Sequence, residues 1–263
     1  MNDRITEGAV CGPDGCEVPN ETAAGAANLP AGAATLPRID IVSDAVCPWC
    51  FIGKRHLERA LELLAGEGLA FSIHWHPFQL NPDMPPDGTD RREYRTAKFG
   101  SWERSQELDA RIVQAAAATG LDFHPERQTR TPNTVQAHRL IWLAGQLEAQ
   151  GHEGLGQAGL QDRAMEAVFT AYFVAARDIG RHDVLADCAA AVGIDRDAAL
   201  AFLAGEDGRE AVLRGDAMAR NAGVNGVPSF FLDGQGLFSG AQPPEAMADA
   251  LRRAHKILYP QAA

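Results

Sequence analysis

The stretch that decides the fold is SDAVCPWCFIGK, residues Ser43–Lys54. It lies between a strand-like run, Ile39–Ser43, and a helix-like run that begins near Phe51. Its two cysteines, Cys47 and Cys50, are separated by two residues. Because a dithiol with this spacing at a strand-to-helix junction suits thiol–disulfide exchange, the stretch predicts a redox site on an α/β scaffold.

The start of the helix explains why the two cysteines should differ in chemistry. Free backbone N–H groups and the positive end of the helix dipole stabilise a thiolate on Cys47. Pro48 suits an early helical position, where its missing N–H costs nothing. Cys50 follows about one turn later and could attack a mixed disulfide on Cys47. The spacing also supplies half of many zinc sites, so context has to distinguish the two uses.

That context lies far downstream, in the stretch GVPSFFL at residues 226–232. It reads as a turn that enters a short apolar strand, with Pro228 at its first position because proline cannot donate to a sheet ladder. Val227, just before it, is expected to present its backbone to a client chain by strand addition. Asp233 and Gly234 then signal a hairpin.

Several segments in a fixed order resemble one family, the DsbA-like thioredoxin-fold oxidoreductases, and within it the FrnE-like subgroup. The resemblance implies a thioredoxin core interrupted by a helical insertion, with Cys47 and Cys50 as the redox pair and Pro228 as a cis proline. It covers roughly Arg38 to Tyr259. The segments that carry it are SDAVCPWCFIGK from Ser43, HPFQLNPDMPPDG from His76, NTVQAHRLIWLA from Asn133, GVNGVPSFF from Gly223 and SGAQ from Ser239.

The predicted fold class is therefore α/β, a thioredoxin fold with a large all-helical insertion. Residues 1–37 are expected to form a flexible arm, since they are rich in Ala, Gly and Pro and have no helical or strand periodicity. Residues 38–89 and 223–263 form the predicted core. Residues 90–222 form the predicted insertion, in which Thr131 and Pro132 are expected to cap a helix and open its first turn.

Composition limits the classes of protein that fit. The chain has 263 residues, of which 46% are hydrophobic, so it can bury a sizeable core. Its net charge of −11 argues against nucleic-acid and anionic-membrane partners. No segment is apolar for long enough to span a bilayer. The N-terminus lacks a basic start followed by an apolar stretch, so a cytoplasmic location is expected.

Cys11 and Cys16 form a second cysteine pair, in the arm. The turn-forming residues between them could let the sulfurs meet, and a flexible linker from Cys16 to Arg38 would span roughly 25 Å, enough to reach the active site. One hypothesis is that this auxiliary pair exchanges electrons with Cys47 and Cys50. The alternative is a structural zinc site formed by all four cysteines.

The remaining candidates have simpler interpretations. Asp44 could influence proton transfer at the dithiol, although a turn residue at a strand end is the simpler reading. Trp49 cannot accept a proton and is expected to shape client contact. His74 and His76 share a strand face but lack an evident third metal ligand. Cys188 is expected to be a small buried apolar residue.

The predicted function is a dithiol–disulfide oxidoreductase, acting as a reductase or isomerase because the cytosol is reducing. It uses no cofactor beyond its redox-active disulfide. Its expected partners are client proteins with thiols or disulfides, and a reducing partner such as glutathione or a thioredoxin system. The alternative is an enzyme similar to kappa-class glutathione transferases or 2-hydroxychromene-2-carboxylate isomerases, which typically have serine in place of Cys47.

Overall fold

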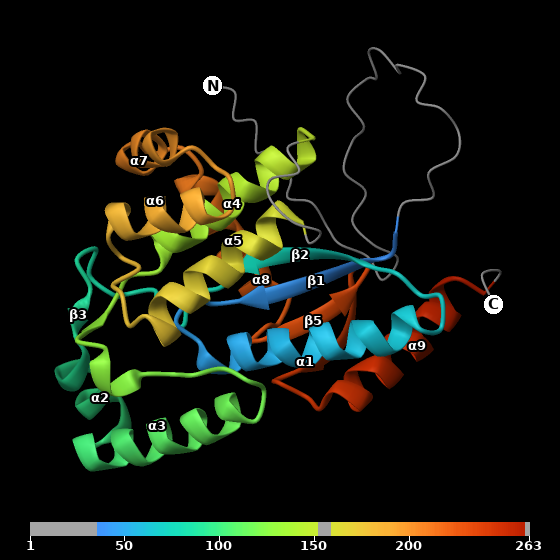
Figure 1. Ribbon diagram of the computed structural model, residues 1–263, viewed down its shortest axis with the longest axis horizontal. Coiled ribbons are helices and arrows are strands. Elements are labelled where there is room, and N and C mark those ends of the chain that lie inside the picture. The colour runs from blue at the N-terminus through green and yellow to red at the C-terminus, as the bar shows by residue number, and fades with distance from the viewer. Residues whose placement is uncertain (1–35, 152–158, 261–263) are drawn as a thin grey trace, which may run out of the picture. The chain divides into compact units, whose positions relative to one another are not determined.

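The computed structural model describes residues 36–151 and 159–260. Its main sheet has the strand order β2-β1-β5-β6 (Figure 1). β1 (Arg38–Ser43) runs parallel to β2 (Ser72–Pro77) and antiparallel to β5 (Ser229–Leu232), which pairs with β6 (Gln235–Ser239). The sheet therefore joins two segments of the chain that lie more than a hundred residues apart, because β1 and β5 are hydrogen-bonded neighbours.

The turn between β5 and β6 follows from its two residues. Asp233 has φ of 46° and Gly234 has φ of 80°. Two successive residues with positive φ match the twist of antiparallel strands, and the Asp-Gly pair supplies them at low cost. The hairpin predicted from this dipeptide is confirmed.

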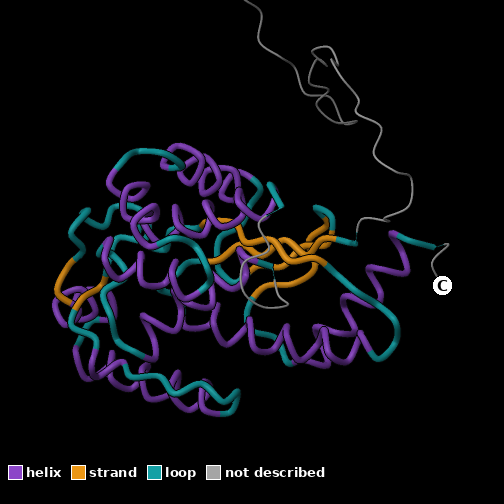
Figure 2. Tube along the Cα trace, turned by 45° about the horizontal axis from the view of Figure 1, so that its top comes forward, coloured by secondary structure: helices purple, strands orange, loops and turns teal. Residues whose placement is uncertain are grey.

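Helices cover both faces of the sheet. α1 (Pro48–Ala65) and α9 (Pro244–Leu258) pack side by side on one face, and α8 (Arg209–Asn221) contacts the other (Figure 1). The tube view shows the strands of the sheet gathered together among the surrounding helices (Figure 2). Alternation along β1 explains the arrangement, because Ile39 and Ile41 join the large hydrophobic core while Val42 packs with residues of the α8 side.

The chain between β2 and β5 is mainly helical, which confirms the predicted fold class of a thioredoxin fold with a helical insertion. Besides α8, this segment holds the short strands β3 (Thr89–Asp90) and β4 (Arg130–Thr131), the helices α2 (Arg91–Phe99), α3 (Trp102–Ala117), α4 (Val135–Ala149), α5 (Leu160–Phe169), α6 (His182–Ala191) and α7 (Arg196–Ala204), the 3₁₀ turn η1 (Pro125–Arg127) and the π-helical turn η2 (Thr170–Val174).

The expected helix start at Thr131 and Pro132 is wrong. Thr131 belongs to β4, which pairs with β3, and α4 begins four residues later at Val135. The side chain of Asn133 accepts a hydrogen bond of 2.9 Å from the backbone N–H of Val135. This local bond satisfies a free helical donor, so Asn133 takes the role that the sequence suggested for Thr131.

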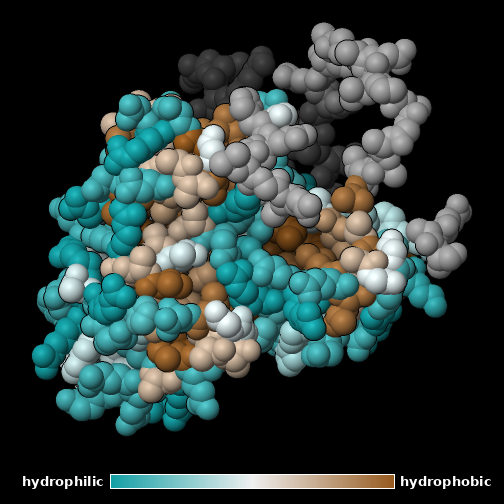
Figure 3. All heavy atoms as spheres, in the orientation of Figure 1, coloured by the Kyte–Doolittle hydropathy of each residue, from teal (hydrophilic) through white to brown (hydrophobic). Residues whose placement is uncertain are grey.

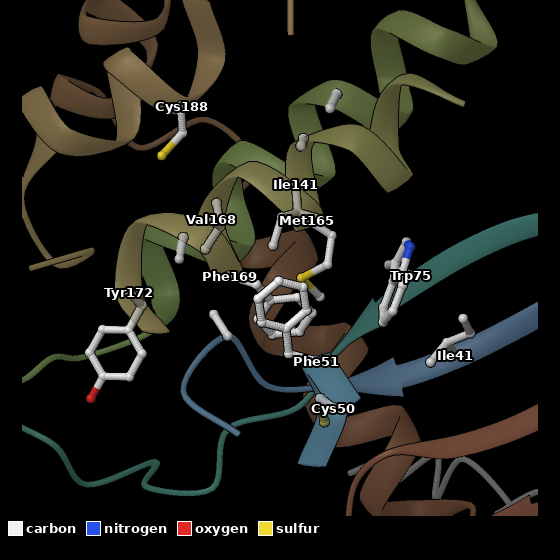
Figure 4. Close-up of a cluster of buried hydrophobic side chains, with 14 of the residues drawn as sticks. Ile41, Cys50, Phe51, Trp75, Ile141, Met165, Val168, Phe169, Tyr172 and Cys188 are labelled. Carbon is white, nitrogen blue, oxygen red and sulfur yellow. The ribbon is translucent and has the colours of Figure 1, made fainter. Parts of the chain in front are cut away.

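A cluster of stacked aromatic rings joins the insertion to α1. The ring of Phe51, on α1, lies 4.9 Å from the ring of Phe169 and 5.7 Å from that of Phe123. Figure 4 shows Phe51 beside Phe169, with Trp75 and Met165 close by. All five side chains are buried. The insertion is therefore packed directly on the helix that begins with the cysteine motif.

Candidate active site

Cys47 lies at the point where β1 gives way to α1. It is the N-cap residue of α1, has extended backbone angles, and is followed by Pro48 at the first helical position. Its backbone N–H donates a 3.0 Å hydrogen bond to the carbonyl of Asp44, which closes the turn after β1. The residue therefore lies at the amino end of the helix, which is the positive end of the helix dipole.

The tertiary fold brings Val227 and Pro228 to this cysteine. The thiol of Cys47 donates to the carbonyl oxygen of Val227 across 3.6 Å, and the Val227–Pro228 peptide bond is cis. Gly53, on α1, lets Pro228 pack close to this helix, since a Cβ at Gly53 would lie only 3.1 Å from Cγ of Pro228. Pairing of β1 with β5 places these segments together, with Val42 opposite Ser229.

Cys50 occupies a different environment from Cys47. Both residues are buried free thiols, but Cys47 is 4% exposed and lines a cavity, whereas Cys50 is 0% exposed and does not. Burial raises the pKa of Cys50 well above its usual value, and the neighbouring Cys47 sulfur raises it further. Cys50 therefore stays protonated at neutral pH, which suits a second thiol that acts only after the first has reacted.

A cavity of about 410 Å³, the Cys47 cavity, opens beside the first cysteine. It is lined by Cys47, Trp49 and Val227 from the thioredoxin part and by residues of the insertion, including Arg91 and Tyr172. In the space-filling view, hydrophobic residues gather between α3, the start of α1 and the end of α5 (Figure 3). The predicted insertion thus supplies one wall of the site.

Tyr172 is the most buried polar group of this wall. Burial raises its pKa to about 12, so the phenol remains protonated at neutral pH. Figure 4 shows its hydroxyl directed away from the Phe51 and Phe169 rings. Its backbone carbonyl accepts a 2.7 Å hydrogen bond from the side chain of Gln128, another residue of the wall.

Two arginines on α2 share one carboxylate at the cavity. Nη2 of Arg91 lies 3.0 Å from Asp109, and Nη2 of Arg95 lies 2.6 Å from the other oxygen of the same carboxylate. Burial, and next the Arg91 cation, lower the pKa of Arg95. Arginine nevertheless remains charged in proteins, so this corner of the cavity carries excess positive charge.

Asp44 ties the cysteine loop to the rest of the site. Its side chain is fully buried and accepts a 2.7 Å hydrogen bond from the backbone N–H of Leu80. Nε2 of the buried His138, on α4, lies 3.3 Å from the other oxygen of Asp44 and 3.2 Å from the carbonyl of Phe78. The carboxylate therefore connects the loop before Cys47, the segment after β2 and the insertion.

The other sequence candidates fall in different places. Trp49 is 43% exposed at the rim, and His76 lies 2.7 Å from Asp40 in an ion-pair geometry on the sheet. Cys188 is buried in the insertion, as predicted. Within residues 36–151 and 159–260 there is no group of three or more metal-ligating side chains. Cys11 and Cys16 lie outside the described residues, as do their proposed relay and zinc site.

Sequence reasoning missed Arg91, Asp109 and His138. None of them lies within a motif that marks its chemistry, and each reaches the site from the insertion. His138 does lie in the stretch from Asn133 that carries the family resemblance, but that resemblance assigned no role to it. Residues of this kind are recognised by their neighbours in space rather than by their neighbours in the chain.

A thioredoxin-type sheet, with a free dithiol at the first turn of α1 and a cis proline facing it, defines a thioredoxin-fold thiol protein. Residues 38–252 match the model of the DSBA-like thioredoxin domain. The chain therefore belongs to the DsbA-like thioredoxin family.

Similar proteins agree with this assignment. The probable DsbA oxidoreductase SCO1869 from Streptomyces coelicolor is 29% identical, with a TM-score of 0.71 over 83% of this chain and 89% of its own. The cytosolic disulfide reductase DsbM from Pseudomonas aeruginosa, solved with GSH, is 20% identical, with a TM-score of 0.57 over 83% of this chain and 99% of its own. This second likeness shows the fold alone.

A curated relative is the uncharacterized protein YwbO of Bacillus subtilis (strain 168), 28% identical over 157 residues. The match covers 60% of this chain and 66% of that protein. Among the described residues, the helices are all too short or too polar to cross a membrane.

Proposed function

We propose that the protein is a dithiol–disulfide oxidoreductase that reduces or isomerises disulfides through Cys47 and Cys50. The observation that carries the proposal is the asymmetry of the two thiols. Cys47 lies at the amino end of α1, beside a cavity and the carbonyl of Val227, whereas Cys50 is completely buried one turn later. Cys47, although only 4% of it is exposed, lines the cavity that a substrate would enter, whereas Cys50 is 0% exposed and does not line it.

In the proposed mechanism, the Cys47 thiolate attacks one sulfur of a substrate disulfide. A bond forms between Cys47 and that sulfur, and the other substrate sulfur leaves as a thiolate that takes up a proton. Cys50 then loses its proton and attacks the Cys47 sulfur, which releases the second substrate thiol. The enzyme dithiol is oxidised to a disulfide by two electrons, and the substrate is reduced by the same two.

Three residues would bind the substrate around Cys47. Val227 and Pro228 precede β5, and the Val227 carbonyl already accepts the Cys47 thiol. A client backbone could take over this acceptor by strand addition. Trp49 offers an exposed indole at the rim, where a large apolar surface favours contact with a client.

The proposal includes the partners and the compartment. After each turnover the Cys47–Cys50 disulfide needs a reductant, and we propose glutathione or a thioredoxin system. The fold shared with DsbM, a protein described as cytosolic and solved with GSH, supports this choice and a cytoplasmic location. Membership of the FrnE-like subgroup and a redox role for Cys11 and Cys16 belong to the same proposal.

A glutathione redox titration tests the function. In a variant that carries Cys11→Ser and Cys16→Ser, we expect one reversible two-electron couple. The oxidation state of Cys47 and Cys50 is read at each point of the titration by alkylation and mass spectrometry. Cys50→Ser should accumulate a mixed disulfide with glutathione at Cys47, and Cys188→Ser should titrate like the parent. Absence of a couple, with zinc retained by the full chain, would favour the zinc site instead.

The same titration on the full chain tests the auxiliary pair. If Cys11 and Cys16 exchange electrons with the active site, the full chain should show a second couple or a shifted potential relative to the double serine variant. If both proteins have the same reduction potential and reduce insulin at the same rate, Cys11 and Cys16 take no part in the mechanism.

A further inference from the structure

The Cys47 cavity contains buried polar groups that the protein itself leaves unsatisfied. Nε of Arg91 and Oγ1 of Thr131 are buried and have no hydrogen-bond partner among the described residues. Both residues line the cavity and are at least nine-tenths buried. Because an unsatisfied buried donor costs about 1–3 kcal/mol, such groups call for an explanation, and a ligand that supplies acceptors is one.

The charges around these groups favour an anion. Arg91 and Arg95 share one carboxylate, that of Asp109, and the further partner of Arg95, Ser105, is neutral. Lys98 lines the same cavity and also has neutral hydrogen-bond partners, Asn81 and Tyr94. Among the described residues, the cavity lining therefore contains these three cations and the single carboxylate of Asp109. A carboxylate suits an arginine because the planar guanidinium can bind it through two parallel hydrogen bonds.

The rest of the lining favours an apolar body. Its walls are aromatic and aliphatic, with Leu108, Ile112, Phe99, Phe123 and Phe173 from the insertion. A polypeptide backbone that continued past Val227 into this part of the cavity would leave its amide groups unpaired against such walls. A cavity of about 410 Å³ is the size of pockets that hold small organic molecules.

Resting on the proposed function, we propose that the Cys47 cavity binds low-molecular-weight disulfides that have an aromatic or other apolar body and a carboxylate. The carboxylate meets Arg91 beside Thr131, the body lies against the phenylalanine walls, and the disulfide sulfur faces Cys47. Arg91 is thereby a specificity-determining residue. In each turnover the reduced Cys47–Cys50 dithiol gives two electrons and two protons to the disulfide, and two substrate thiols leave.

A matched pair of substrates isolates the carboxylate. The disulfide of para-mercaptobenzoate and the disulfide of para-mercaptobenzamide have the same shape and differ in charge. The pre-reduced protein is mixed with each, and release of the aromatic thiol is followed by absorbance. The readout is the ratio of the two rate constants, divided by the same ratio for free dithiothreitol to remove differences in intrinsic reactivity.

For the unmodified protein, we expect the corrected ratio of rate constants to favour the mercaptobenzoate disulfide by at least about tenfold. A preference of this size corresponds to one charge-assisted contact. Arg91→Gln should reduce this preference to near the dithiothreitol value. Arg92→Gln is the matched control, because Arg92 lies on the same helix and does not line the cavity. It should keep the preference.

The unmodified protein supplies a test that does not depend on how a variant folds. The unreactive acid para-toluate should slow oxidation by both disulfides, whereas para-toluamide at the same concentration should not. No acid preference in the unmodified protein, or an equal loss in Arg91→Gln and Arg92→Gln, would overturn the inference. Failure of every disulfide, insulin included, to oxidise the protein would instead overturn the proposed function.

Discussion

Replacing Lys54 by methionine should destabilise the protein by about 3–5 kcal/mol. Lys54 lies on α1, one turn after Cys50, and only 3% of it is exposed. Its ammonium lies 3.1 Å from Asp162 and 3.2 Å from Glu166, both on α5, and 2.5 Å from Glu58 on its own helix. The residue therefore joins α1 to the insertion through an ionic cluster in which Lys54 and Asp162 are buried and Glu58 and Glu166 are partly exposed.

The structure gives the scale of this effect. Burial lowers the pKa of Lys54, but Asp162, Glu166 and Glu58 outweigh it and raise the pKa from 10.5 to about 12. That rise in the pKa of Lys54 corresponds to about 2 kcal/mol in favour of the charged form. Methionine fills a similar volume but leaves the Asp162 carboxylate, which is 7% exposed, without its buried cation, and this adds to the loss.

Urea unfolding at pH 7 measures the loss. Arg59→Met is the matched control, because Arg59 pairs with Glu62 on the exposed face of the same helix and should cost less than about 1 kcal/mol. Since the folded pKa of Lys54 is raised, its stabilisation is complete below about pH 10.5 and disappears as the pH rises through about 12. Equal losses for Lys54→Met and Arg59→Met would refute the reasoning.

Three further outcomes are expected. Burial raises the pKa of Asp40, but His76 and Arg38 outweigh it and hold that pKa below 3.8, so its stabilisation is present above pH 4 and lost as the pH falls further. Asp40→Asn should therefore flatten the decline of urea midpoints between pH 5 and 2, and an unchanged decline would contradict this. Phe51→Ala should cost about 3–5 kcal/mol in urea unfolding, because it empties the centre of the aromatic cluster; a loss below 1 kcal/mol would argue against that role. Burial raises the pKa of Cys188 to about 11, so iodoacetamide at pH 8 should leave it unmodified in the native protein, as peptide mass mapping can check.

Local sequence signals were sufficient for much of the core. Three signals each act over a few residues and have the predicted structure: the strand-like run 39–43, Pro48 at the start of a helix, and Asp233-Gly234 as a hairpin turn. The start of α4 was misplaced because Thr131 and Asn133 are both good capping residues. Pairing of Thr131 with Thr89 in β3 and β4 decided between them, and that contact spans more than forty residues.

The wall of the candidate site could not be inferred in the same way. Arg91 and Asp109 look like ordinary surface charges of amphipathic helices in the sequence, yet they meet beside a cavity that also holds Cys47. Asp44 reads as a turn residue, and only the packing of α4 shows that it is buried against His138. The sequence does not reveal such desolvation, because burial depends on what packs against each group.

By itself, the sequence determined the chemistry available to this protein: two thiols one helical turn apart, at the end of a strand, with a proline-led strand to follow. These features depend on short-range backbone geometry, so neighbouring residues are enough to specify them. Only the tertiary structure decided how the thiols differ, since pairing of β1 with β5 brings Val227 to Cys47 and packing buries Cys50. It also decided what lies near Cys47, because the insertion folds back and lines the same cavity with cations and aromatic rings.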